Sequence, residues 1–364
     1  MKAGIVGLPN VGKSTLFNCL SNAKAQSANF PFCTIEPNLG VVNVPDPRLQ
    51  ALEKLVNPER VVPATVEIVD IAGLVKGASK GEGLGNQFLG NIRETDAILH
   101  VLRCFDNDNI VHVDGSVDPI RDKETIDIEL QLKDLETVDK RLEKAGRAAR
   151  TGNKEAQKEA AVLETVKKGL ESGISARAIP RDEADDLEFI RPLQLLTDKP
   201  VLYVCNVDES AASTGNAYVD RVREAVAGEN AGVLVLAVAT EADISELETY
   251  EERQLFLDDL GLDEPGGSKL IRSAYSLLKL QTYFTAGEKE VRAWTIPVGA
   301  TAPQAAGVIH TDFEKGFIRA EVISYDDYVA LGSESRVREA GKMRVEGKDY
   351  VVSDGDVMHF RFNV

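Results

Sequence analysis

The sequence has little of the residues that build disulfide frameworks, metal clusters and membrane spans. Its 364 residues include four cysteines, four histidines, three methionines and one tryptophan. The cysteines are scattered without C-x-x-C spacing or nearby histidine pairs, which excludes the usual patterns of a disulfide scaffold or a zinc site. No stretch approaches the length of a membrane span without charges, and no signal-peptide pattern begins the chain. We therefore expect a cytoplasmic protein with no membrane contact.

Positive charge is also scarce. Lysine and arginine number 42 against 59 aspartates and glutamates, and the net charge of -17 opposes a uniform attraction to nucleic acid. The exception is a local cluster of cations, hereafter the basic cluster, which consists of Lys140, Arg141, Lys144, Arg147, Arg150, Lys154 and Lys158. This cluster suits either an RNA contact or a solvated helix tip, and the sequence leaves both open.

What the sequence does contain is a phosphate-binding motif near its beginning. Residues 7–14, Gly-Leu-Pro-Asn-Val-Gly-Lys-Ser, fit G-x-x-x-x-G-K-[ST] and lie between an apolar run and an amphipathic segment. The glycines let backbone N–H groups face a phosphate, Lys13 reaches the outer phosphates, and Ser14 can ligate magnesium. The motif predicts a nucleoside triphosphate site. The further contacts expected from it are Asn10, Val11, Gly12 and Thr15.

Two further segments have the order and spacing expected of magnesium and switch elements. Asp70 ends an apolar strand and is followed by Gly73, which predicts an aspartate that holds magnesium through water and an N–H that faces the terminal phosphate. Thr34, in a polar loop after the first helix, is a weaker candidate for a threonine that closes over magnesium, because a turn residue would look the same.

The residues expected to act on water depart from the common pattern. Leu74 stands where Ras-like proteins place a glutamine that orients the attacking water, and leucine cannot hydrogen-bond to water. We therefore expect slow hydrolysis that uses another group. His112 is the best-placed free histidine for polarising water, with an ordinary surface histidine as the alternative. Lys13 and His112 are the expected catalytic residues.

The base-reading element is also altered. Asn206-Val207-Asp208-Glu209 follows the apolar run 201–205, at the place of the guanine-reading N-K-x-D. Val207 replaces the lysine whose stem covers the base, and Glu209 replaces the aspartate that accepts hydrogen bonds from guanine. Because adenine lacks the N1–H donor, a strict guanine reader is no longer required. We expect ATP to bind at least as well as GTP, with Asn206, Val207 and Glu209 at the base.

Apolar runs that alternate with helical patterns predict a doubly wound α/β domain, whose ligand lies beyond the carboxyl ends of parallel strands. The predicted strands cover residues 5–6, 66–71, 97–102, 201–205 and 233–238. Between residues 124 and 170, apolar residues recur every three or four positions with a break at 151–153, which predicts an inserted antiparallel helical hairpin.

The last part of the chain predicts a small α+β module. A helix over residues 270–280 follows Pro265-Gly266-Gly267, and strands are expected at 291–296, 317–323 and 358–364. The expected domains are a discontinuous nucleotide-binding domain at 1–123 and 191–277, the hairpin at 124–190, and the closing module at 278–364.

With these motifs assembled, the chain resembles the Obg-like ATPase family, specifically its bacterial YchF group, along essentially its whole length. The most specific stretches are residues 7–14, 29–38, 70–85, 91–97, 206–209 and 281 to the end. The resemblance implies hydrolysis of ATP, an inserted coiled coil, a C-terminal TGS domain of ubiquitin-like shape, and ribosome association. It also implies adenine recognition by Asn206 and Glu209, a catalytic role for His112, and potassium activation through Asn10. A departure from the common fifth motif, Ala239-Thr240-Glu241, leaves the base-contacting backbone there open.

Three functions stay open at this point. The first is a slow, magnesium-dependent ATPase that acts as a nucleotide-dependent switch on the ribosome. The second is a nucleotide-gated binding protein with incidental hydrolysis, which a His112→Ala variant would separate from the first. The third is a GTPase, as neighbouring families are, which competition between ATP and GTP would test.

Overall fold

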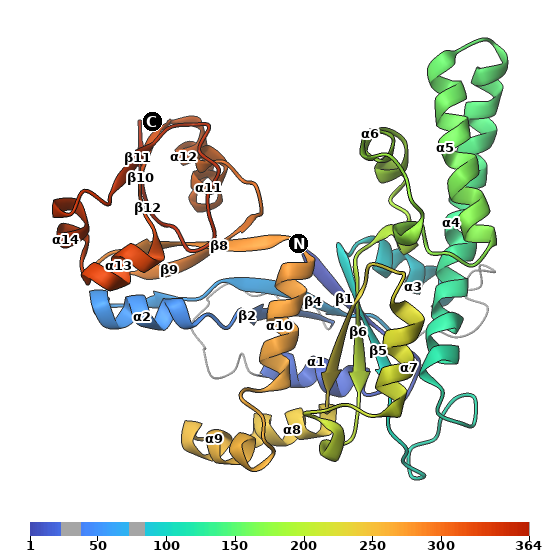
Figure 1. The fold of residues 1–364 in the computed structure, drawn as a ribbon, viewed down its shortest axis with the longest axis horizontal. Coiled ribbons are helices and arrows are strands. Elements are labelled where there is room, and N and C mark those ends of the chain that lie inside the picture. Colours follow the sequence, from blue (N-terminus) through green and yellow to red (C-terminus); the bar gives the residue numbers. More distant parts are fainter. Residues whose placement is uncertain (23–37, 73–83, 364) are drawn as a thin grey trace. The chain divides into compact units, whose positions relative to one another are not determined.

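A computed structural model describes residues 1–22, 38–72 and 84–363 (Figure 1). Thr34, Cys33, Gly73 and Leu74 therefore lie outside the described residues. Contacts divide the chain into two compact units. The first consists of Met1–Gly40 and Glu67–Leu270, and the second of Val41–Val66 and Ile271–Val364.

One six-stranded sheet has the order β2-β4-β1-β5-β6-β7, and its residues belong to the first unit except for residues 41–43 of β2 and 65–66 of β4. Its strands are β1 (Lys2–Val6), β2 (Leu39–Asn43), β4 (Thr65–Asp70), β5 (Ala97–Arg103), β6 (Val201–Asn206) and β7 (Gly232–Leu236). The neighbours from β4 to β7 all pair in parallel. Every residue of β5 and β6 is buried, as expected for central strands covered on both faces. The predicted doubly wound α/β fold is confirmed. Strand β2 was not predicted from the sequence; it is a five-residue edge strand.

Helices connect these strands. They are α1 (Lys13–Asn22), α3 (Leu84–Arg93), α4 (Pro119–Arg150), α5 (Lys154–Glu171), α7 (Ala217–Val226), α8 (Val238–Glu246), α9 (Tyr250–Asp259) and α10 (Gly266–Leu277). Short helical turns join α5 to β6, namely η3 (Ala176–Ala178), α6 (Glu183–Asp185), η4 (Asp186–Ile190), η5 (Arg191–Leu193) and η6 (Leu196–Asp198). Helix α1 packs against α8, and α4 contacts β5 and α7 near its beginning.

The predicted helical hairpin is confirmed as α4 and α5 (green in Figure 1). Helix α4 begins at Pro119, five residues earlier than the apolar pattern suggested, because Asp118 accepts hydrogen bonds from the N–H groups of Ile120 and Arg121. Its 32 residues make a rod about 48 Å long, at about 1.5 Å of rise per residue. The hairpin has its own core, formed by Val138, Ala145, Leu163, Val166, Leu170, Ala176, Ile179, Ile190 and Leu195.

A buried carboxylate fastens α4 to the segment before β6. Asp134 is fully buried and accepts hydrogen bonds from the N–H groups of Leu196 and Thr197 and from the Thr197 hydroxyl, each at 2.7 Å. Burial raises the pKa of Asp134 to about 6, and the three donors oppose that rise. Since these donors would be left unpaired without it, Asp134 fixes the middle of α4.

A second buried cluster fastens the first turns of α4. The Lys123 ammonium lies 2.6 Å from Asp127 and 2.5 Å from Glu229, and Glu229 also lies 2.9 Å from the Arg177 guanidinium. The Tyr203 hydroxyl on β6 donates to Glu229 at 2.7 Å. Each buried charge therefore has an opposite partner, which is the condition under which burial is tolerated.

The second unit contains another six-stranded sheet, with the order β11-β10-β12-β8-β9-β3. Its strands are β3 (Val61–Val62), β8 (Leu280–Ala286), β9 (Val291–Pro297), β10 (Phe317–Ile323), β11 (Arg344–Glu346) and β12 (Val357–Phe362). Its helices are α2 (Pro47–Val56), α11 (Ala302–Ile309), α12 (Thr311–Lys315), α13 (Tyr325–Leu331) and α14 (Glu334–Glu339). The three strands predicted for this part are present as β9, β10 and β12, whereas β8 and β11 were not predicted.

Residues 41–66 belong to this second unit by their contacts, although the sequence suggested that they belong with the nucleotide-binding part. Strand β3 pairs in parallel with β9, and Arg48 of α2 lies 2.7 Å from the Asp354 carboxylate. The domain boundaries drawn from the sequence stay a prediction. Of the helices in the described part of the chain, none has the length and hydropathy needed to cross a bilayer.

We expect stability to fall in acid partly because of His100 on β5. Its side chain is buried against Tyr203, with ring centroids 5.4 Å apart, and burial lowers its pKa from 6.5 to about 3. Between these two values the unfolded chain binds a proton that the folded chain does not, so the free energy of unfolding falls as pH falls. Between the two pKa values, His100 lowers the free energy of unfolding by about 1.4 kcal/mol for each unit by which the pH falls. Urea unfolding of wild type and His100→Leu between pH 7 and pH 5 measures it, and parallel curves would contradict the assignment.

Candidate nucleotide site

The phosphate loop lies between β1 and α1, and two of its glycines are required by close contacts. Gly12 has a φ of +94°, and a Cβ there would lie 2.5 Å from the Asn206 amide nitrogen. A Cβ on Gly7 would lie 2.9 Å from the Val101 carbonyl oxygen. Asn10 also has a positive φ, of 64°, which asparagine tolerates better than most residues. The loop is therefore a tight turn with no room for a side chain at positions 7 and 12.

The predicted phosphate and metal ligands meet at the end of β4. The Lys13 ammonium is buried and pairs with an Asp70 carboxylate oxygen, and the Ser14 hydroxyl donates to the other oxygen at 3.3 Å. Ser14 and Thr15 are exposed, whereas Val11 is buried. A cation, a hydroxyl and a carboxylate within hydrogen-bond reach form the donor set that holds a phosphate and a magnesium ion in phosphate-loop proteins.

Asn206 ends β6 and connects the phosphate loop to the beginning of α8. Its amide nitrogen donates to the Val11 carbonyl oxygen at 2.9 Å, and its amide oxygen accepts from the Val238 N–H at 3.0 Å. The residue is 4% exposed, so both bonds are sheltered from water. The first residue of the altered base-reading element therefore holds two backbone segments in register.

The remaining residues of that element differ in exposure. Val207 is buried and its N–H donates to the Leu236 carbonyl at 3.0 Å. Asp208 caps the turn η7 (Glu209–Ala211) by accepting from the Ala211 N–H at 3.1 Å. Glu209 is exposed, and its carboxylate takes no part in that cap. Of the two exposed acids in the element, Asp208 is thus used in the cap of η7 and Glu209 is not.

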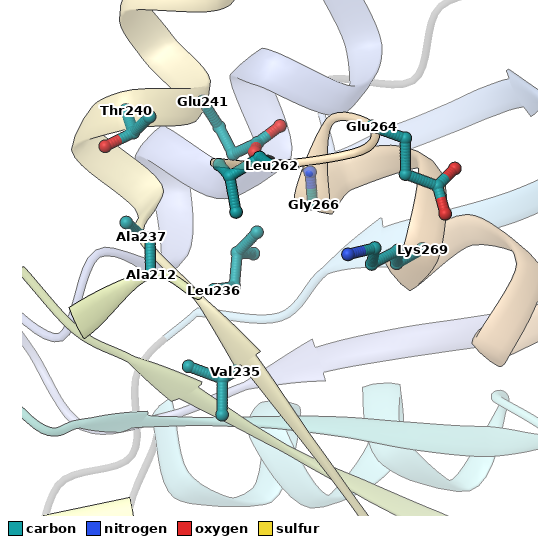
Figure 2. Close-up of a pocket in the computed structure, with 10 residues that line it drawn as sticks. All are labelled: Ala212, Val235, Leu236, Ala237, Thr240, Glu241, Leu262, Glu264, Gly266 and Lys269. Carbon is teal, nitrogen blue, oxygen red and sulfur yellow. Dashed lines mark hydrogen bonds between the residues drawn. The ribbon is translucent and has the colours of Figure 1, made fainter. Parts of the chain in front are cut away.

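The departure in the fifth motif has a structural explanation. Glu241 accepts hydrogen bonds from the N–H groups of Gly266 and Gly267, at 2.7 and 2.9 Å, and so caps α10. Burial raises the pKa of Glu241 and the two N–H groups oppose that rise. Figure 2 shows this carboxylate turned toward Gly266 beside a small hollow. The hollow is lined by Ala212, Val235, Leu236, Ala237, Thr240, Glu241, Leu262, Glu264, Gly266 and Lys269, and its lining includes no phosphate-loop residue.

His112 is in the expected loop but is not a surface residue. It is buried, its Nε2 lies 2.8 Å from an Asp122 carboxylate oxygen, and its Nδ1 accepts a hydrogen bond from the Asp114 N–H at 3.1 Å. The expectation of a free histidine is therefore wrong in this respect. Asp122 was not found from the sequence. The available signal was its place in the first turn of a helix that begins shortly after His112.

The loop that carries His112 is held by two other residues. The Arg103 guanidinium, at the end of β5, donates to the carbonyls of Phe105, Asn107 and Ile110 at 3.2, 3.0 and 2.9 Å. The Asn10 side chain of the phosphate loop donates to the Val111 carbonyl at 3.1 Å. Sequence reasoning did not identify Arg103, which is 2% exposed. His112 thus belongs to a loop attached to the phosphate loop itself.

Within the described part of the chain, one group of side chains has the spacing of metal ligands, namely His112, Asp114 and Asp122. The Arg121 guanidinium lies 3.3 Å from Asp122 and 3.6 Å from Asp114. One cation therefore already lies beside both carboxylates, and both histidine nitrogens are hydrogen-bonded. The group is best described as an ion-paired cluster that orients His112.

The strand, glycine turn and helix, with Asp70 at the end of a neighbouring parallel strand, define a phosphate-loop nucleotide-binding protein. Two family models match the chain. Residues 2–145 match a family described as "50S ribosome-binding GTPase", and residues 280–363 match the YchF-GTPase C-terminal family, described as "Protein of unknown function (DUF933)".

Individual relatives identify the family. The chain is 59% identical over 363 residues to the "Ribosome-binding ATPase YchF" of Haemophilus ducreyi, covering all of this chain and 99% of the relative. It is 56% identical over 366 residues to that of Bacillus subtilis, with full coverage of both. The solved YchF GTPase of Schizosaccharomyces pombe has a TM-score of 0.89 and 40% identity, covering 99% of this chain and 97% of that one. The chain belongs to the YchF family.

We expect Gly12→Ala to abolish tight nucleotide binding. The new Cβ collides with the Asn206 amide, and the alanine must adopt a positive φ. The phosphate loop and the Asn206 side chain, which links it to α8, therefore cannot both keep their positions. The affinity for a fluorescent ATP analogue should fall at least tenfold in titrations. Gly90→Ala on α3 is the matched control, because a Cβ there meets nothing within 4 Å. Wild-type affinity in Gly12→Ala would contradict the assigned geometry.

Proposed function

We propose that this chain is a magnesium-dependent ATPase that hydrolyses ATP to ADP and phosphate and acts as a nucleotide-dependent switch that binds the ribosome. The observation that carries the proposal is the joining of two elements by Asn206. The phosphate loop supplies Lys13 and Ser14 beside Asp70, and the base-reading element has Glu209 in place of the guanine-specific aspartate. The names of its relatives, which are ribosome-binding ATPases, support the same function.

The described residues fit a magnesium ion. Ser14 and Asp70 offer a hydroxyl and a carboxylate oxygen 3.3 Å apart, and Thr34 is the proposed third oxygen ligand. When bound, magnesium neutralises charge on the outer phosphates. With nucleotide bound, Lys13 would pair with phosphate oxygens instead of Asp70, and the Asp70 carboxylate would then be available to hold the metal. Gly73 contributes an N–H to the terminal phosphate. For potassium, Asn10 is the proposed ligand, because its bond to Val111 uses the amide nitrogen and not the amide oxygen.

Adenine recognition rests on Glu209. An exposed carboxylate at this position accepts a hydrogen bond from the exocyclic amine of adenine, while Asn206 and Val207 hold the segment that carries it. A GTPase is the second candidate, favoured by the description of the matched family as a GTPase and by the same word in the name of the fission-yeast relative. The ATPase and the GTPase differ in one measurable quantity, which is the affinity for ATP relative to that for GTP.

His112 is the proposed group that polarises the attacking water, with Lys13 stabilising charge on the transferred phosphate. Leu74 cannot take the water-orienting role, so the unassisted rate is slow. The hydrogen bond between Asn10 and the Val111 carbonyl, which attaches the loop of His112 to the phosphate loop, supports this role. A nucleotide-gated binding protein with incidental hydrolysis is the alternative that keeps the same site.

The partner surface is proposed to include the hairpin. Three members of the basic cluster are paired, namely Arg141 with Glu159, Arg147 with Glu143 and Lys158 with Asp185. The others are exposed cations: Lys140, Lys144, Arg150 and Lys154. They suit contact with ribosomal RNA phosphates in a cytoplasmic protein whose remaining surface is acidic. The proposed domains are the nucleotide-binding part at 1–123 and 191–277, the hairpin at 124–190 and a TGS domain at 278–364.

We expect ATP to compete with a labelled nucleotide at least as well as GTP in the presence of magnesium and potassium. Glu209→Asp should restore part of the guanine preference, because the shorter carboxylate matches the usual guanine reader. Isothermal titration with ATP and GTP measures both affinities. A preference of the wild type for GTP above about tenfold, roughly 1.4 kcal/mol, would favour the GTPase instead.

We expect the exposed cations of the hairpin to carry a salt-dependent part of ribosome binding. Combined Lys144→Gln, Arg150→Gln and Lys154→Gln should weaken co-sedimentation with ribosomes at least tenfold at low salt and reduce its salt dependence, since three phosphate contacts are lost. Lys54→Gln, Arg223→Gln and Lys289→Gln remove the same number of exposed cations elsewhere and serve as the control. An equal loss in both triple variants would show only a nonspecific charge effect.

A further inference from the structure

The hydrogen bonds of His112 determine which of its nitrogens carries the proton. The Asp114 backbone N–H can only donate, so Nδ1, at 3.1 Å, must accept and be unprotonated. The Asp122 carboxylate accepts, so Nε2, at 2.8 Å, must carry the hydrogen. A neutral imidazole has one proton and one free lone pair, and here both are occupied.

This arrangement matters for the reaction proposed above. As the water oxygen bonds to phosphorus, its proton must pass to an unprotonated ring nitrogen or be drawn by one. In the observed state Nδ1 is occupied by Asp114 and Nε2 is already protonated. The ring is also 7% exposed, and Asp122 is 1% exposed, so water does not substitute for these partners. His112 cannot assist hydrolysis until it leaves this position.

We propose that Asp122 is a positioning residue that holds His112 in this hydrogen-bonded state, and that release of His112 from Asp122 precedes each hydrolysis event. The inference rests on the proposed function, because it assumes that His112 acts on water. It adds a residue of α4 to the control of the site. Arg121, at 3.3 Å from the second oxygen of Asp122, keeps the carboxylate in place.

Of the two hydrogen bonds of the His112 ring, the one to Asp122 is the one that a side-chain substitution can remove. Arg103 and Asn10 hold the loop through backbone carbonyls of residues 105–111, and Asp114 contacts the ring through its backbone. Asp122 contacts it through a buried carboxylate, and a charged acceptor makes a hydrogen bond about twice as strong as a neutral one. Asp122→Asn keeps the shape and an acceptor oxygen but removes the charge.

Single-turnover ATP hydrolysis at saturating ATP, magnesium and potassium tests the proposal. Asp122→Asn should raise the rate roughly three- to tenfold, because the state that withholds His112 is weakened. His112→Ala should be nearly inactive, and the double variant should be no faster than His112→Ala. Asp139→Asn makes the same change at a solvent-facing position of α4 and should match wild type. An unchanged or lowered rate in Asp122→Asn would overturn the proposal.

A spectroscopic measurement on the wild-type protein tests the protonation of His112 without relying on the folding of Asp122→Asn. In wild-type protein with ¹⁵N-labelled histidine, the resonance lost in His112→Ala identifies this ring among the four histidines. We expect a neutral ring protonated at Nε2, and a ring protonated at Nδ1 would overturn the proposal. The two failures are distinguishable. Wild-type hydrolysis by His112→Ala would refute the catalytic role, whereas an inactive His112→Ala with an unaccelerated Asp122→Asn would refute only the role of Asp122.

Discussion

The nucleotide site depends on the two hydrogen bonds of the Asn206 amide. One amide group at the end of β6 contacts the Val11 carbonyl in the phosphate loop and the Val238 N–H at the beginning of α8. Because both bonds are buried, loss of either would leave an unpaired polar group away from water. Parallel strands make this possible, since the carboxyl ends of β1, β4, β5 and β6 meet at one edge of the sheet.

Charge is distributed very differently in the interior and at the surface. The chain is strongly acidic overall, yet the buried charges of Lys123, Asp127, Arg177 and Glu229 are paired with opposite charges, and the buried Asp134 carboxylate is held by N–H and O–H donors. The exposed cations of the hairpin stand out against the acidic composition. An acidic protein with a local basic surface binds a polyanion only through that surface, which favours one orientation of binding over many.

Much of the fold and the phosphate site could be predicted from the sequence because their signals are local. The phosphate loop, the apolar central strands and the hairpin each follow from consecutive residues, and Lys13, Ser14 and Asp70 come together as expected. Strand β2 and the attachment of residues 41–66 to the second unit were missed, because edge strands and long-range pairing leave weak local patterns.

The environment of His112 could not be predicted for the same reason. Asp122 and Arg103 contact this loop only after the chain folds, and an aspartate in a first helical turn or an arginine at a strand end is common in any sequence. The prediction that His112 is free of partners was therefore wrong, although its loop was placed correctly. The role of the altered fifth motif could not be predicted either, because Glu241 caps α10 through the N–H groups of residues distant in the sequence.

Helix α4 extends without interruption from the turn that contains Asp122 to Arg150 at the far end of the hairpin. Asp134 and the cluster around Lys123 fasten its first half, so a force applied at the free end acts on a stiff beam clamped at its base. A stiff helix held in this way passes a force from its free end to its fixed end with little bending. Asp122, which accepts the hydrogen bond of His112, lies in the fixed part of α4. A force on the far end of the hairpin therefore reaches Asp122 through one continuous helix.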